Sequence, residues 1–98
     1  MPNGRDLKHI LEKIYNHDSL VGIDLRNLYL SFMDFTGLEL RRTDLEGCCL
    51  SHASLNRAKL AGAILTNVVA DGASFEDATG LTPSTIEYLK AKGANGLD

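Results

Sequence analysis

The sequence lacks any uninterrupted apolar run of the roughly 18 to 20 residues that a membrane-spanning helix requires. It also lacks an apolar stretch near its start, because the first 13 residues, MPNGRDLKHILEK, carry charges where a secretory signal peptide would be apolar. Only two cysteines are present, and the adjacent pair Cys48 and Cys49 suits neither a disulfide framework nor paired metal ligands. We therefore expect a cytoplasmic protein with no membrane partner.

Strong charge of one sign is missing as well. The 13 acidic and 10 basic side chains leave a net charge of −3, too weak to indicate a nucleic-acid-binding surface or a strongly anionic one. The basic side chains that come closest to a patch are Arg41, Arg42, Arg57 and Lys59. No aromatic residues are interleaved with them, and we interpret them as surface ion-pair partners, for example Lys59 with Glu39. The sequence thus argues against nucleic acid as a partner.

Leucine and phenylalanine recur at every fifth residue. The series is Leu25, Leu30, Phe35, Leu40, Leu45, Leu50, Leu55, Leu60, Leu65, Ala70 and Phe75. A second series of apolar or small residues lies two positions earlier, from Ile23 to Ala78. Residues two apart in an extended chain point the same way, so each pentapeptide directs two side chains to one side and must then turn. Both series can face one interior only if the chain winds as a solenoid.

The units MDFTG, TDLEG, ASLNR, AKLAG and ASFED resemble the repeats of the pentapeptide-repeat family, and the resemblance covers residues 21–80. It implies an all-β solenoid, namely a right-handed quadrilateral β-helix with one pentapeptide on each side. With about twenty residues in each coil and about 4.8 Å between stacked coils, the stack would have about three coils and be about 15 Å tall. Residues twenty apart would then form columns, such as Phe35, Leu55 and Phe75.

The residues that flank the repeats predict a helical cap at each end, which would seal the open backbone of a solenoid. Over residues 5–16, the spacing of Leu7, Ile10, Leu11 and Ile14 is that of one helical face. Over residues 83–92, Thr82 is the expected N-cap and Gly93 the expected stop. We expect one domain over residues 1–98, with the last five residues loose apart from Leu97.

No group of residues predicts an enzyme, a metal site or a cofactor. The histidines His9, His17 and His52 are isolated, with no second ligand at a useful spacing. Cys48 should point inward as a small core residue, and Cys49 outward as an inert thiol, because no base or helix terminus lies beside it to lower its pKa. Thr43 should point inward and bond to nearby backbone. A filled interior leaves no pocket for a small-molecule substrate.

One side of the expected solenoid has an apolar outer surface. This side, formed by residues 26–30, 46–50 and 66–70 and here named side two, would carry Tyr29, Cys49 and Val69 in one outward column. Phe32 would lie at the adjoining corner and Ile64 near the preceding one. These five residues are either covered by a cap or tail, scattered surface residues without a role, or a surface that contacts a partner.

These features favour a non-enzymatic module for protein–protein interaction or scaffolding, whose partner is another protein or a second copy in a homodimer. The resemblance implies one alternative, because some longer members of the family resemble duplex DNA and bind DNA gyrase. Against that alternative, few coils are expected here, and basic residues such as Arg26 and Arg41 interrupt the acidic surface. The physiological role does not follow from the sequence.

Overall fold

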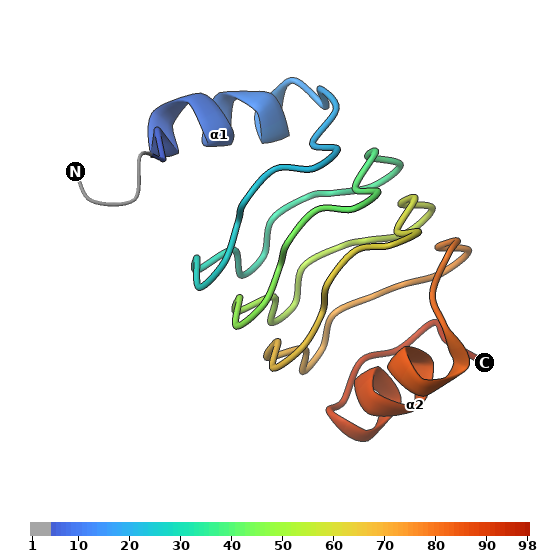
Figure 1. The fold of residues 1–98 in the computed structure, drawn as a ribbon. Coiled ribbons are helices and arrows are strands. Elements are labelled where there is room, and N and C mark those ends of the chain that lie inside the picture. The colour runs from blue at the N-terminus through green and yellow to red at the C-terminus, as the bar shows by residue number, and fades with distance from the viewer. Residues whose placement is uncertain (1–4) are drawn as a thin grey trace.

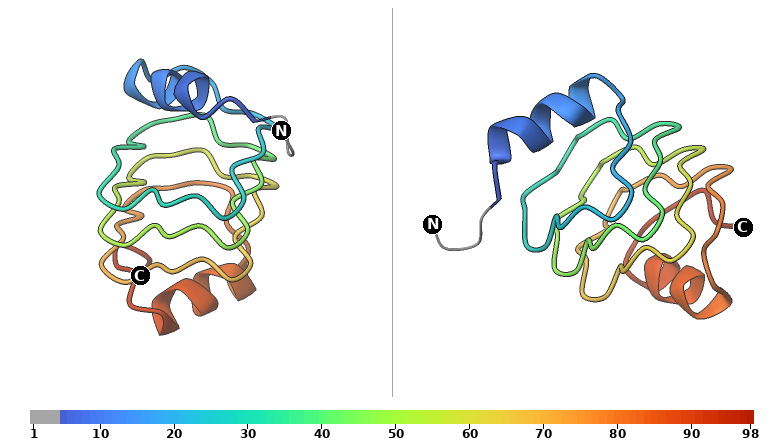
Figure 2. Two further views of the ribbon diagram at one scale, coloured as in Figure 1. Left: turned by 90° about the vertical axis from the view of Figure 1, so that its left-hand side faces the viewer. Right: turned by 45° about the horizontal axis from the view of Figure 1, so that its top comes forward.

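A computed structural model describes residues 5–98 of the chain. It contains two helices, α1 (Leu7–Tyr15) and α2 (Pro83–Ala91), which lie at opposite ends of a stack of coils (Figures 1 and 2). Within the described part, neither helix is long and apolar enough to cross a membrane. The single domain expected over residues 1–98 includes residues 1–4, which lie outside the described residues.

Parallel β-bridges between residues twenty apart join each coil to the next. On side two, the Leu30 amide donates to the Cys49 carbonyl at 2.8 Å, and the Cys49 amide donates to the Leu28 carbonyl at 3.0 Å. The outward residues of the four ladders are Asp24, Asp44 and Ile64 on side one, Tyr29, Cys49 and Val69 on side two, Asp34, Ser54 and Ser74 on side three, and Glu39, Lys59 and Thr79 on side four.

All β structure in residues 5–98 consists of isolated bridges, without a continuous strand. The expectation of an all-β solenoid is therefore met only in part. A pentapeptide explains this, because its first two residues form a turn and leave one ladder residue between the two inward positions. The pairing of each coil with the next is regular, although no side is long enough to form a strand.

The interior is filled by the two apolar series of the sequence. Phe35, Leu55 and Phe75, which succeed one another at intervals of twenty residues, are each at most 1% exposed. The larger residues of the second series in the first coil, among them Ile23 and Met33, are partly buried and pack against this core. Burial of such side chains stabilises a fold by roughly 1.5–3 kcal/mol each, so the repeat supplies the main stabilising term.

Two inward polar side chains bond to the coil that precedes their own. The Thr43 hydroxyl donates to the Leu20 carbonyl at 2.7 Å, and the Cys48 thiol donates to the Leu25 carbonyl at 2.8 Å. Thr43 was expected to use nearby backbone, but its acceptor lies 23 residues away in the sequence. The stacking of coils explains the difference, because it places the carbonyl of one corner directly beside the next coil.

The cap helix α1 begins after Asp6, whose side chain accepts the His9 amide at 3.2 Å. Ile10 and Ile14 are buried against the first coil, whereas Leu7 and Leu11 are 50% and 36% exposed. Only two of the four residues expected on the apolar face are therefore buried. Ile10 and Ile14 lie four residues apart on one row of the helix, and this row alone faces the coil.

At the other end, α2 begins after the expected N-cap Thr82, whose hydroxyl accepts the Thr85 amide at 3.3 Å. After Gly93 the chain returns to side three. The Asn95 amide donates to the Ala73 carbonyl at 2.9 Å, and the Phe75 amide donates to the Asn95 carbonyl at 2.9 Å. The expectation of a loose tail is wrong, because Asn95 adds a further rung to side three.

We predict that Leu55→Asp unfolds the protein and that Thr79→Asp does not. Leu55 is completely buried, so the substitution would place an unpaired charge in the core, at a cost of several kcal/mol out of a typical total of about 5–15 kcal/mol. Thr79 lies in an outward ladder and is exposed, so its carboxylate variant stays hydrated. Circular dichroism during urea denaturation measures both. A folded Leu55→Asp variant with unchanged stability would contradict the inward assignment.

Candidate interaction surface

Side two places its outward side chains in one parallel ladder. Cys49 bridges both Tyr29 and Val69, so these three residues form a continuous column across the coils. Tyr29 is 89% and Val69 49% exposed, and Cys49 is partly exposed. Neither helix covers this column, since Tyr29 and Val69 at the two ends of the column remain exposed to solvent. The structure thus brings together three of the five residues that the sequence singled out.

Phe32 lies at the corner between side two and side three. Its ring stacks on that of His52, with the centroids 5.0 Å apart and 18° between the planes. Both residues have positive φ angles, of 65° and 62°, and Phe32 remains 76% exposed. The next residue in this corner column is Gly72, where an added Cβ would overlap the His52 ring. Phe32 therefore extends the exposed surface of side two round this corner.

Ile64 belongs to a different ladder. It bridges Asp44 on side one and is 43% exposed. It lines a cavity of about 410 Å³ between the last coil and α2, together with Tyr88. The Tyr88 hydroxyl donates to the Val68 carbonyl at 3.0 Å, so α2 is fixed to the end of side two without covering its face.

The Cys49 thiol is more acidic than expected. Its Sγ lies 3.1 Å from the Ser31 hydroxyl and 3.5 Å from the Ser51 hydroxyl. These hydrogen bonds, with that of Ser31 first, lower the pKa of the thiol. The prediction considered only a base or a helix terminus as a cause of a lowered pKa, whereas here the cause is hydroxyl groups, and Ser31 approaches Cys49 across the stack from the preceding coil. By contrast, burial raises the pKa of the Cys48 thiol.

Two of the histidines, His17 and His52, each lie near one carboxylate. His17 Nε2 is 3.7 Å from Asp34, and His52 Nε2 is 4.0 Å from Asp71. Within residues 5–98, no group of three His, Cys, Asp or Glu side chains is placed to hold a metal ion. Since His52 also stacks on Phe32, it lies at the corner that borders side two.

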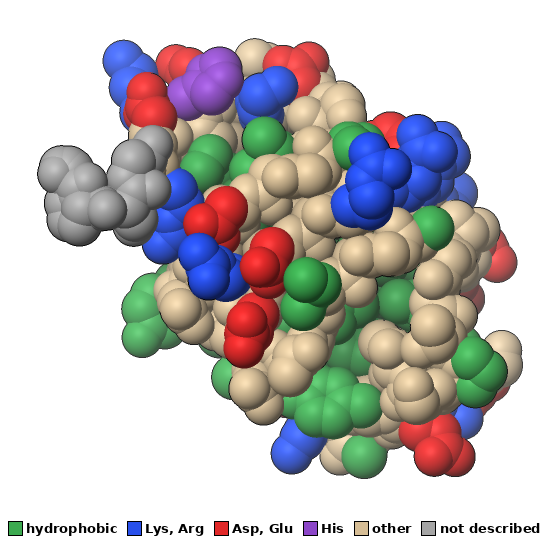
Figure 3. Space-filling view, in the orientation of Figure 1, with side chains coloured by type: hydrophobic (Ala, Val, Ile, Leu, Met, Phe, Trp, Pro, Cys, Tyr) green, Lys and Arg blue, Asp and Glu red, His purple; other side chains and the backbone are tan. Residues whose placement is uncertain are grey.

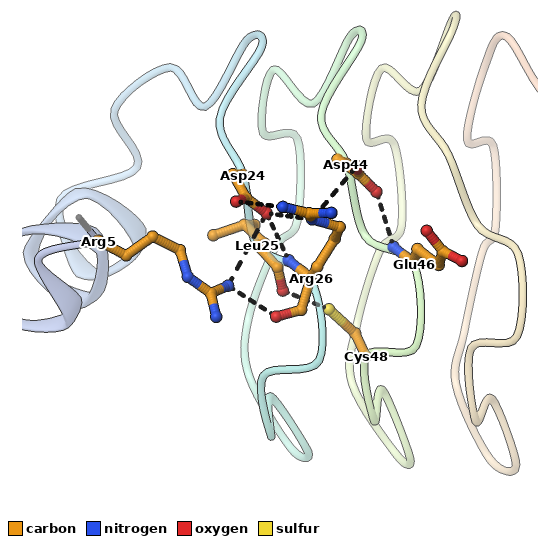
Figure 4. A network of polar contacts seen from close by, with 7 residues as sticks. All are labelled: Arg5, Asp24, Leu25, Arg26, Asp44, Glu46 and Cys48. Atoms are coloured by element: carbon orange, nitrogen blue, oxygen red, sulfur yellow. Dashed lines mark hydrogen bonds and ion pairs between the residues drawn. The ribbon is translucent and has the colours of Figure 1, made fainter. Parts of the chain in front are cut away.

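Ion pairs border side two at its other corner. Arg26 binds Asp24 through two hydrogen bonds of 3.0 and 3.1 Å and lies 3.7 Å from Asp44 (Figure 4). Arg5 donates to the Arg26 carbonyl at 2.6 Å, which ties the segment before α1 to the first coil. Acidic and basic side chains accordingly lie interleaved near the N-terminal end of the stack (Figure 3). The expected pair of Lys59 and Glu39 is also present, at 3.6 Å.

These contacts lower the pKa of the Asp24 carboxyl. Its side-chain hydrogen bond with Arg26 is the largest cause, followed by the bond from the Arg26 amide, and the pKa falls from 3.8 to about 2. A carboxylate whose pKa is lower in the folded state stabilises the fold above its unfolded pKa. That contribution is lost as the pH falls through the folded value, and the 39% exposure of the side chain keeps it modest.

We therefore predict that the free energy of unfolding falls less in Asp24→Asn than in the wild type between about pH 5 and about pH 2. The variant has no carboxyl to protonate at this position, so it lacks this share of the acid sensitivity. Urea denaturation at a series of pH values measures the difference. Arg26→Gln should reduce the acid sensitivity in the same way, because the partner charge is gone. Equal losses in all three proteins would show that the network does not stabilise the fold.

The comparison with family models agrees with the observed repeat. The family model described as Pentapeptide repeats matches residues 19–57 and 48–79, in 8 copies. One similar solved structure is a pentapeptide repeat protein from the thylakoid lumen of Arabidopsis thaliana. It is 22% identical, with 81% of this chain and 80% of that chain covered and a TM-score of 0.35. No curated protein matches the chain.

Proposed function

The chain belongs to the pentapeptide-repeat family, and on that basis we propose that it is a non-enzymatic module for protein–protein interaction or scaffolding. The repeats imply a right-handed β-helix. We infer a four-sided stack of about three coils, closed by α1 and α2, that acts in the cytoplasm. Side two is the surface that contacts a protein partner or a second copy.

The observation that carries this proposal is the contrast between side two and the other ladders. Side three presents Asp34, Ser54 and Ser74, and side four presents Glu39, Lys59 and Thr79. Only on side two do an exposed Tyr, a partly exposed Cys and an exposed Val succeed one another within the described ladders. A contiguous apolar column on a flat face is typical of a contact surface, and Tyr is among the residues that dominate binding energy.

Phe32 supports the same conclusion. A non-glycine residue with a positive φ costs of order 1–3 kcal/mol, and Phe32 combines such an angle with an exposed ring. Stacking on His52 offsets part of that cost, since aromatic pairs contribute about 0.5–1.5 kcal/mol beyond area burial. The second residue of every pentapeptide turn has a positive φ, as at His52 and Arg57, so the angle itself belongs to the repeat. What distinguishes Phe32 is an aromatic ring that stays exposed beside side two. We therefore include the Phe32 corner in the proposed contact surface.

We predict that wild-type protein self-associates in a concentration series of sedimentation velocity and that Val69→Asp and Tyr29→Lys weaken the association. A charge buried without a partner should cost more than about 1.4 kcal/mol and raise the dissociation constant at least about tenfold. Thr79→Asp is the matched control for Val69→Asp, because it adds the same negative charge to the same coil on another side.

Two results would redirect the proposal. If wild type and variants are all monomers, the same variants serve as controls in a pull-down, which then tests side two for a different protein. If Val69→Asp and Tyr29→Lys both associate as strongly as the wild type while remaining folded, side two is not the contact surface.

A further inference from the structure

The last coil leaves an open backbone edge on side four. Thr79 pairs with the preceding coil. Its amide donates to the Ala58 carbonyl at 3.0 Å, and its carbonyl accepts the Leu60 amide at 2.8 Å. In trans peptides the neighbouring groups point the opposite way, so the Ala78 carbonyl and the Gly80 amide face away from the stack. Within residues 5–98, neither group has a backbone hydrogen-bonding partner.

At the same end, the chain itself closes side three and satisfies one backbone group of side two. On side three, Asn95 occupies the corresponding rung and bonds to both Ala73 and Phe75. On side two, the Tyr88 hydroxyl satisfies the Val68 carbonyl.

Side one borders the cavity of about 410 Å³ along α2, whose described lining contains no charged side chain. On side one, too, the Ala63 carbonyl and the Leu65 amide have no backbone partner within residues 5–98. Side four therefore differs from side one in the carboxylates that surround its open edge.

The open edge forms the floor of a cavity of about 430 Å³, which lies within the usual range of roughly 300–1,000 Å³ for ligand sites. Leu81, Ile86 and Leu97 supply apolar walls, and Glu76, Asp77 and Asp98 supply carboxylates. Asp98 pairs with Lys90 at 3.3 Å. Glu76 and Asp77 form no ion pair with any described residue, so their charge is available to a ligand.

We propose that this edge binds an extended, basic segment of a protein partner by addition of a parallel rung. One ligand residue would donate its amide to the Ala78 carbonyl and accept the Gly80 amide, as Asn95 does with Ala73 and Phe75 on side three. The residues on either side of it point toward the apolar walls, because side chains alternate along an extended chain.

The register also places the ligand's charges. In a parallel rung the paired ligand residue lies over Thr79, and the ligand chain before it approaches the corner formed by Glu76 and Asp77. An extended ligand leaves the coil at this corner, because residues 76 and 77 form a turn and Gly96 already lies against Glu76. Long basic side chains on the ligand residues two and three positions before the paired one can reach toward Glu76 and Asp77, which form no ion pair with the described residues. The preferred segment therefore has two basic residues, an apolar residue, the paired residue and a second apolar residue, in that order.

The test is a titration of the full-length, ¹⁵N-labelled chain, followed by NMR, with a capped peptide of the sequence Lys-Lys-Val-Thr-Val. We expect a saturable shift of the Gly80 amide and slower exchange of its proton. N-methylation of the peptide's Thr should abolish this shift, because that amide is the donor to Ala78. N-methylation of the Val before it should not, because that amide points away from the edge.

Charge variants separate the contribution of the carboxylates to peptide binding from that of the backbone hydrogen bonds. Glu76→Lys should weaken binding of the peptide about fivefold at low salt, whereas Glu12→Lys on α1, with the same change in net charge, should not. Absence of a saturable Gly80 shift at millimolar peptide, or equal binding of the two N-methylated peptides, would overturn the proposal. Val69→Asp should leave peptide binding unchanged, so failure here and failure of the side-two proposal are distinguishable.

Discussion

One backbone rung on each side, repeated every twenty residues, is the constraint on which this structure depends. Each rung uses the amide and carbonyl of a single residue, as Cys49 shows with Leu28 and Leu30. It thereby fixes the two neighbours of that residue inward and the residue itself outward. A position in the sequence therefore specifies a column, and a face of the protein is composed of residues twenty apart.

This constraint explains why the two proposed binding surfaces differ in kind. Along its sides the rungs are satisfied, so recognition depends on outward side chains, as with Tyr29 and Val69 on side two. At its end the rungs are open unless something fills them, so recognition depends on backbone groups such as the Gly80 amide. Side chains select a partner on the first kind of surface, whereas on the second they only adjust the preference for one extended segment over another.

Features that depend on strict repetition could be predicted from the sequence. The inward series, the pair of Glu39 and Lys59 and the position of Thr82 before α2 needed only the period and local capping rules. Features that break the period, or that join residues of neighbouring coils that are not twenty apart, could not be predicted. Asn95 pairs with Ser74 at a spacing of twenty-one residues, beyond the repeats, and no pattern indicates it. Ser31 reaches Cys49 from the neighbouring coil, so the lowered pKa of that thiol depends on contacts between coils.

The two proposed surfaces differ in direction, and this matters for scaffolding. The side chains of side two point away from the axis of the coils, whereas the Ala78 carbonyl and Gly80 amide point along it. A partner on side two would therefore leave the edge on side four open, and a strand added there would leave Tyr29 and Phe32 exposed. Because the coils are joined by a rung on every side, the two surfaces stay fixed relative to each other. If both proposed surfaces bind, the module would hold two partners at once without any change in its own conformation.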